Sequence, residues 1–159
     1  MSKEKEQSSY DINTLAPSHK LWKTIWNLSI PPKVLNFMWR VAKNAILVKI
    51  NLVKRHVLSK VTCDHYQSHL EDMLHALWLC PCLTKVWESD IVWRFRSTES
   101  LTDFQKLVLH VEEAGLGLEL FSMIVWLLWQ RRNQVRVGTP TIPLSQIVTR
   151  AQQQLQDFY

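Results

Sequence analysis

The chain has 159 residues and a formal net charge of +5; 47% of its residues are hydrophobic and 3 are Gly. This length allows one domain with a modest core, and the composition argues against a disordered chain and favours a helical one. The 3 Cys and the charged, polar start without an apolar run argue against a secreted disulfide framework. We therefore expect an intracellular protein, in the nucleus or cytoplasm. The longest apolar run, residues 120–129, is too short to span a membrane, so no membrane partner is expected.

The positive charge is concentrated in the first part of the chain. Residues 1–60 carry 11 Lys and Arg against 3 Asp and Glu, residues 61–100 carry 3 against 6, and residues 101–159 carry 5 against 5. A concentrated positive field favours a polyanion such as RNA or DNA, although a helix face that only meets solvent gives the same pattern. The 8 Trp have two interpretations too, because large aromatic residues more often build a core than stack on bases.

Residues 1–17 are polar and predict a flexible leader. Ser18 is expected to cap a short helix in which Trp22 and Trp26, four residues apart, form an aromatic edge. The pair Pro31-Pro32 ends this helix and starts the next one, at about residues 33–44, because a residue before proline avoids the α conformation while proline suits a first helical turn.

The second predicted helix carries a narrow basic stripe. Its polar positions recur three and four residues apart, so they share one face of an otherwise apolar helix. A third helix, at about residues 49–58, extends this positive surface. Phosphate contacts are expected from Lys33, Arg40, Lys43, Lys54 and Arg55. The alternative is structural, because a largely buried helix must expose some side chains and Lys and Arg do so at low cost.

The segment from Cys63 to Cys80 gathers the potential metal ligands of the chain. Cys63, position 66, His75 and Cys80 have the spacing of a zinc knuckle, but position 66 is Tyr, which is not a usual zinc donor. A fourth ligand could come from His69, His65 or Cys82, or from water.

Zinc in this segment would join a turn at Cys63 to a short helix that carries His75, with no catalytic role. Asp72 or Glu71 could cap that helix or accept the second imidazole N–H. Without metal, the same residues would be buried thiols and a hydrogen-bonded imidazole.

The second half of the chain predicts four more helices. The first runs from Pro81 to about residue 94 and buries Ile91 among others; the next is capped by Thr102 or Asp103 and ends near Gly115. A nearly all-apolar segment at about residues 118–135 predicts the central core helix, where Arg131 and Arg132 complement the dipole at the C-terminal end. A linker then leads to an amphipathic helix over residues 144–158.

The order of these motifs resembles the plant reverse-transcriptase zinc-binding domain, which follows the polymerase in LINE-type retrotransposons. The resemblance covers residues 20–135 and departs at Tyr66, where the family has its second Cys. In relatives a ribonuclease-H-like domain commonly follows. The resemblance implies zinc as the cofactor, bound by Cys63, His75 and Cys80. Its motifs are Leu21-Trp22-Lys23, Ile25-Trp26, Ile30-Pro31-Pro32-Lys33, Phe37-Met38-Trp39-Arg40, Asn51-Leu52, Arg55, Cys63, Glu71-Asp72, His75, Cys80-Pro81, Val86-Trp87, Trp126, Trp129 and Arg132-Asn133.

We therefore predict a mainly α protein, a single helical domain with a small zinc-knuckle-like element and little or no β structure. The expected parts are a leader (1–17), a reverse-transcriptase zinc-binding-type domain (18–95), a helical extension (96–135), and a linker with a terminal helix (136–159). Glycine-rich phosphate loops, nucleophile elbows and paired catalytic aspartates are missing from the sequence, so no enzymatic activity and no small-molecule substrate are expected. Weak, electrostatic nucleic-acid binding is the predicted function; the alternatives are a protein-interaction fragment and a decayed retroelement reading frame.

Overall fold

The computed structural model describes residues 18–65, 67 and 69–159; the predicted leader and Tyr66 lie outside the described residues. Within them the chain is mainly α-helical, as the sequence predicted, and β pairing is confined to an isolated antiparallel bridge between Thr62 and Leu70. None of the described helices combines the length and the apolar character needed to cross a membrane.

The first helices begin where the sequence predicted. The Ser18 hydroxyl accepts a hydrogen bond from the Leu21 N–H and caps α2 (His19–Trp26), and proline occupies the first turn of α3 (Pro32–Ala42). The third helix, α4 (Lys49–Lys54), is shorter than predicted. His56 takes a left-handed φ of 59° and the Val57 N–H bonds the Leu52 carbonyl, which closes the helix there.

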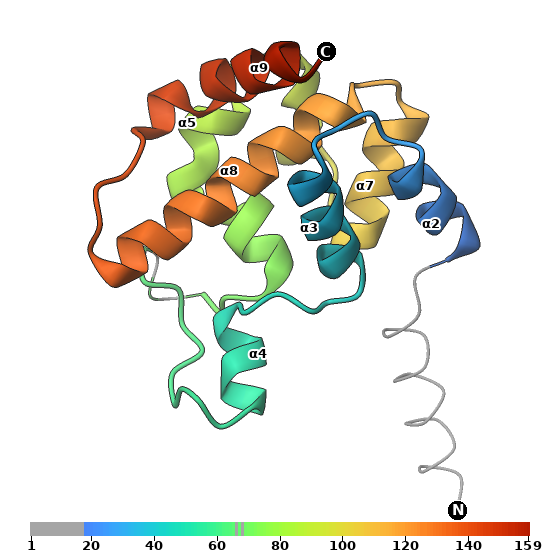
Figure 1. Cartoon of the computed structure of the whole chain (residues 1–159). Coiled ribbons are helices and arrows are strands. Elements are labelled where there is room, and N and C mark those ends of the chain that lie inside the picture. Colours follow the sequence, from blue (N-terminus) through green and yellow to red (C-terminus); the bar gives the residue numbers. More distant parts are fainter. Residues whose placement is uncertain (1–17, 66, 68) are drawn as a thin grey trace, which may run out of the picture.

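The centre of the fold is α8 (Leu118–Val137), the helix predicted from its nearly continuous apolar character. It is surrounded by α3, α7 (Phe104–Glu113) and α9 (Ile147–Phe158) (Figure 1). Asp103 caps α7 through the Lys106 N–H, and the short 3-10 helix η4 (Leu144–Gln146) precedes α9. The residues that α8 buries are Leu118, Phe121, Ser122, Met123, Ile124, Val125, Leu127, Leu128 and Trp129.

Three tryptophans form an aromatic cluster in the core, at Trp78, Trp87 and Trp93. Each is 1% exposed, and the Trp78 and Trp87 ring centroids are 4.7 Å apart. Phe121 of α8 contacts the same rings, with centroid distances of 5.5 Å to Trp87 and 5.7 Å to Trp93. The interpretation of Trp as a core residue therefore holds for these positions.

The prediction of a single helix after Pro81 is wrong. The segment is broken into η2 (Pro81–Leu83), α5 (Thr84–Trp87), η3 (Ile91–Trp93) and α6 (Phe95–Thr98). On one continuous α-helix Trp87 and Trp93 would point about 120° apart around the axis, so one helix face could not bury both. A break at Asp90, whose carboxylate accepts the Val92 N–H, turns both rings inward and leaves Ile91 66% exposed instead of buried.

Candidate metal centre and basic surface

Cys63, His75 and Cys80 come together in the structure. One donor atom of each residue lies within 4.8 Å of the donors of the other two, and all three residues are buried. The Sγ atoms of Cys63 and Cys80 are 3.9 Å apart. Two thiolates bound to one tetrahedral zinc ion at about 2.3 Å each would be separated by roughly 3.8 Å. The sulfur spacing therefore fits a zinc ion without rearrangement of the backbone.

Two local structures position these ligands. The first is a hairpin turn, in which the Cys63 N–H bonds the His69 carbonyl at 2.9 Å and the Glu71 N–H bonds the Val61 carbonyl at 2.7 Å. The second is a short helix that the Asp72 carboxylate caps, because it accepts the His75 N–H at 2.7 Å. The cap role proposed for Asp72 is thus confirmed.

The helix that carries His75 is a π-helix, η1 (His75–Leu79), where the sequence predicted an ordinary helix. The Cys80 N–H bonds the His75 carbonyl five residues back, at 3.0 Å. Residues five apart on an α-helix point about 140° apart, which would separate these two side chains. The wider π turn and the chain reversal at Cys80 bring the imidazole and the thiol to one side. Such π turns often mark functional sites.

The imidazole of His75 fits a metal ligand. Its Nε2 atom is buried and has no hydrogen-bond partner among the described residues. Burial, and then the neighbouring His69, lower the pKa of His75, so the ring is neutral near pH 7. A neutral imidazole offers one nitrogen lone pair, and a buried nitrogen without a partner is unfavourable unless something binds it.

The thiol of Cys80 needs a cation in order to ionise. Burial raises the pKa of Cys80 to about 12, against a smaller lowering effect from the backbone N–H of Cys82. A zinc ion at this position would displace the proton, because thiolate is the form that binds metal.

The three candidates for a fourth ligand are placed less favourably. Cys82 and His65 line a cavity of about 30 Å³ together with Cys63 and Cys80, and this volume is enough for a single ion or water. The Cys82 thiol is 3.8 Å from the backbone carbonyl of His65. The His69 ring stacks on the His75 ring with centroids 5.6 Å apart. The group of mutually close donors includes none of the three candidates.

A buried ion pair fastens the hairpin to the central helix. The Arg132 guanidinium of α8 donates to both carboxylate oxygens of Glu71, and the Lys49 backbone N–H donates to Glu71 Oε1 at 3.0 Å. The same guanidinium lies 4.8 Å from the centroid of the Trp129 ring. Glu71 therefore neither caps the short helix nor bonds the imidazole, and its carboxylate pairs with Arg132 instead.

Two supporting residues were missed in the sequence. Arg96 donates to the Trp78 carbonyl at 2.8 Å and to the Cys80 carbonyl at 3.1 Å, so it holds the end of η1. Lys49, only 8% exposed, donates to the Thr62 carbonyl at 2.8 Å and thereby holds the turn before Cys63. The position of Lys49 within the apolar run Ile46 to Ile50 could have indicated that this lysine is buried. No local pattern in the sequence indicates the role of Arg96.

The five predicted phosphate contacts lie at or near the surface, and we call them the basic surface: Lys33, Arg40, Lys43, Lys54 and Arg55. All but the half-buried Lys43 are exposed. Two of them lie over aromatic rings, with the Lys33 Nζ 4.8 Å from the Trp126 centroid and the Lys43 Nζ 3.7 Å from the Trp39 centroid. Residues 18–60 contain no Asp or Glu, so few carboxylates compete for these cations.

A groove of about 460 Å³ extends the basic surface onto α8. Its lining includes Arg40, Arg132 and Arg136, with the apolar side chains of Leu47 and Val137. Arg136 was not predicted as a phosphate contact, because the helix that carries it was expected to end at residue 135.

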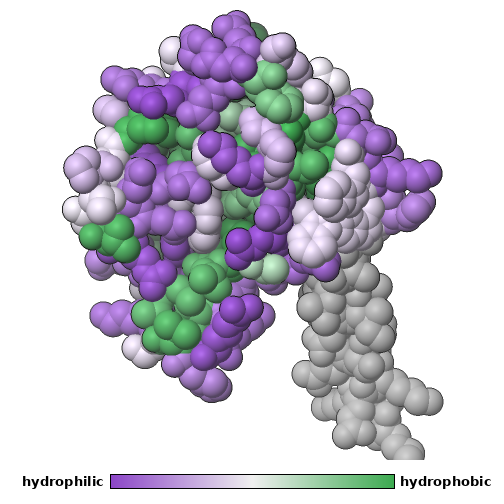
Figure 2. All heavy atoms as spheres, in the orientation of Figure 1, coloured by the Kyte–Doolittle hydropathy of each residue, from purple (hydrophilic) through white to green (hydrophobic). Residues whose placement is uncertain are grey.

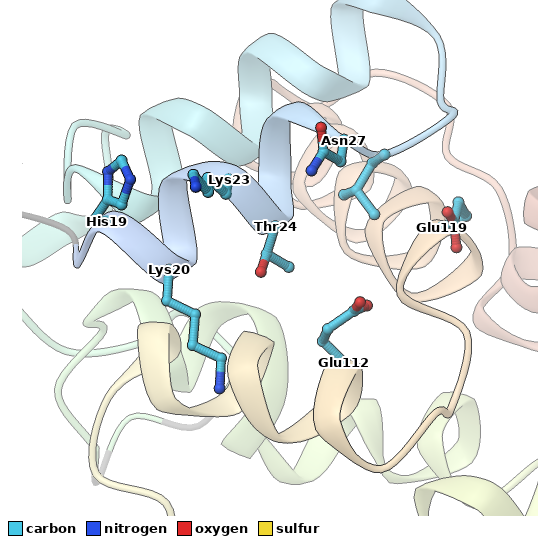
Figure 3. Close-up of a pocket in the computed structure, with 8 residues that line it drawn as sticks. His19, Lys20, Lys23, Thr24, Asn27, Glu112 and Glu119 are labelled. Atoms are coloured by element: carbon cyan, nitrogen blue, oxygen red, sulfur yellow. The ribbon is translucent and has the colours of Figure 1, made fainter.

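A separate hollow of about 450 Å³ lies between α2 and α7 (Figure 3). Basic and acidic side chains face each other across it, Lys20 and Lys23 on one side and Glu112 on the other. The Lys20 ammonium is 2.5 Å from the Glu113 carboxylate, which lowers the pKa of Glu113. None of the Cys–His cluster lines this hollow, and its mixed charges do not favour an anion.

Comparison with known proteins adds two matches. The sequence model of the family described as zinc-binding in reverse transcriptase matches residues 6–87. This span includes the entire Cys–His cluster. A putative ribonuclease H protein of Arabidopsis thaliana is 26% identical over an alignment of 117 residues, which covers 68% of this chain and 18% of that protein. No solved structure matches the chain significantly.

Proposed function

The chain belongs to the family of zinc-binding domains of reverse transcriptases and is of retroelement origin, and from this premise we propose that it is a non-catalytic module that binds one structural zinc ion and, weakly, RNA or DNA. The zinc ligands are Cys63, His75 and Cys80. The basic surface contacts the phosphates. We place the parent element among the plant LINE-type retrotransposons and the site of action in the nucleus or cytoplasm, where RNA and DNA are found.

One observation carries the zinc proposal: three soft or borderline donors converge, and the imidazole among them has a buried nitrogen, Nε2, without a partner among the described residues. The metal-free interpretation requires a hydrogen-bonded imidazole, and the described residues provide no partner for its Nε2 atom. Zinc would satisfy the nitrogen and both sulfurs together, and would join the hairpin to η1.

Binding rather than catalysis is the role that the geometry supports. The cavity beside the thiols has a volume of about 30 Å³, which leaves no room for a substrate next to a bound ion. The cations of the basic surface lie along α3 and α4 or directly after their ends. This spread suits an extended polyanion.

Metal analysis of the purified protein tests the zinc proposal. We expect about one zinc per chain in the natural protein and a loss of zinc in Cys80→Ser and His75→Ala. Loss of zinc in Cys82→Ser or His65→Ala as well would identify the fourth ligand. Tyr66→Cys is the comparison for a gained ligand. If zinc is absent from the natural chain and reaches about one per chain only in Tyr66→Cys, the natural site does not bind zinc and the proposal is wrong.

The salt dependence of binding tests the nucleic-acid proposal. Five phosphate contacts on a single strand predict a slope of about −3.5 for log K against log salt, which is roughly a 100-fold loss of affinity between about 50 and 200 mM salt. The double variant Lys54→Gln/Arg55→Gln should reduce the magnitude of the slope by about 1.4. Lys85→Gln, which removes an exposed lysine outside the basic surface, is the matched control. Affinity that does not change with salt would refute the proposal.

A further inference from the structure

A row of three tryptophans reaches the surface of α2 and α3, and we call Trp22, Trp26 and Trp39 the tryptophan row. The Trp22 and Trp26 rings are nearly parallel, with an interplanar angle of 6° and centroids 6.0 Å apart. Trp39 of α3 continues the row with its centroid 5.4 Å from that of Trp22. Trp26 ends the row and is 54% exposed.

Trp26, at the outer end of this row, lies outside the core. The buried side chains of α2 are Leu21 and Ile25, which are both fully buried, and the core tryptophans lie in later segments. The row leaves a large ring at its outer end in contact with water, which is unfavourable for an aromatic side chain that has no other role. Its outer face is therefore available to a flat, π-rich ligand.

Cations border the row. The Lys43 ammonium lies 3.7 Å from the Trp39 centroid and 5.9 Å from the Trp22 centroid. Around the axis of α3, residues 39, 43 and 40 follow one another within roughly 100°, so the side chain of Arg40 projects next to that of Lys43. Arg40 also lines the groove that contains Arg136.

The position of α3 makes these features one surface. It lies between α2 and α8 (Figure 1), so the tryptophan row is found on its α2 side and the groove that contains arginines on its α8 side. Figure 2 shows the same region of the molecule as pale and purple atoms, the colours of residues of intermediate and low hydropathy. Rings beside cations are the combination by which proteins bind single-stranded nucleic acids, with bases on the rings and phosphates on the cations.

We propose that the tryptophan row stacks on unpaired bases, so that the chain prefers single-stranded RNA or DNA over a duplex. Lys43 and Arg40 bind the phosphates that flank the stacked bases. This inference rests on the proposed nucleic-acid binding and adds to it the strandedness of the ligand. A duplex hides the faces of its bases, so it would use only the cations of the basic surface.

The test compares Trp26→Leu with Trp26→Phe. The first variant keeps an apolar side chain without a π system, and the second keeps a ring. Affinities are measured by fluorescence anisotropy for a labelled oligouridine, a labelled oligothymidine and a labelled RNA duplex. We expect Trp26→Leu to bind both single strands roughly 5- to 100-fold more weakly, Trp26→Phe to stay closer to the natural protein, and duplex affinity to be unchanged. The two single strands distinguish RNA from DNA.

The outcomes separate the two proposals. If Trp26→Leu binds the single strands as tightly as the natural protein, or loses affinity for the duplex equally, stacking on the row is refuted. In that case a loss of affinity in Lys54→Gln/Arg55→Gln would still support electrostatic binding. If the natural protein binds none of the three probes, both proposals fail. Thermal unfolding of each variant shows whether it is folded, and because Trp26 is exposed, a normal melting temperature is expected.

Discussion

The ion pair between Glu71 and Arg132 allows a quantitative test of how the Cys–His hairpin is held. The Glu71 side chain is 4% exposed and that of Arg132 is 11% exposed, so both charges are largely removed from water. In Glu71→Gln the guanidinium stays buried without its counter-charge, and the Lys49 N–H keeps an acceptor only if the amide oxygen faces it. Breaking a buried pair from one side costs about 3–5 kcal/mol.

This cost is large compared with the stability of a domain of this size, which is about 5–15 kcal/mol. We expect a fall in melting temperature of roughly 6–20 °C, taking about 2–4 °C for each kcal/mol. Denaturant unfolding followed by circular dichroism measures the change in the free energy of unfolding. Arg136→Gln, which removes an exposed arginine from the same helix, is the control and should change that free energy by less than about 0.5 kcal/mol.

A double variant identifies the cause. In Glu71→Leu/Arg132→Met both charges are replaced by apolar side chains of similar size, so no buried charge is left unpaired, and the double variant should be more stable than Glu71→Leu alone. If Glu71→Gln costs less than about 1 kcal/mol, or if the effects of Glu71→Leu and Arg132→Met simply add, the ion pair does not fasten the hairpin.

Three smaller effects are also expected. Asp72→Ala removes the acceptor of the His75 N–H at the start of the helical segment 73–79 and should lower the free energy of unfolding by about 1 kcal/mol, measured by denaturant unfolding, whereas Asp72→Asn should keep most of that stability. Arg96→Met leaves the Trp78 and Cys80 carbonyls without their donor and should cost about 1–3 kcal/mol in the same assay; an unchanged midpoint would contradict this role. Lys20→Gln should raise the pKa of Glu113 towards its ordinary value, which NMR titration measures. Because folding depresses this carboxyl pKa, the stabilisation is present above the unfolded pKa and is lost as the pH falls through the folded one.

Local sequence determined where several of the helices begin and which residues could belong to the Cys–His cluster. Caps act within three residues, so Ser18 could be assigned to its helix from the sequence and the cap of α7 could be narrowed to Thr102 or Asp103; the structure confirms Ser18 and shows that Asp103 is the cap of α7. The potential ligands between residues 63 and 80 could also be listed, because a turn and a short helix bring them close whatever the rest of the chain does. The apolar character of residues 118–135 was enough to predict the central helix.

Tertiary packing decided the features that depend on distant residues. Glu71 and Arg132 are 61 positions apart, and no local pattern shows that the carboxylate meets an arginine instead of capping the next helix. The helix predicted after Pro81 breaks because the core must receive both Trp87 and Trp93, and local periodicity cannot show which rings the core will accept. The tryptophan row likewise exists only because α3 packs beside α2 and brings Trp39 onto Trp22. Helix propensity and capping are set by neighbours in sequence, whereas burial and ion pairing are set by neighbours in space.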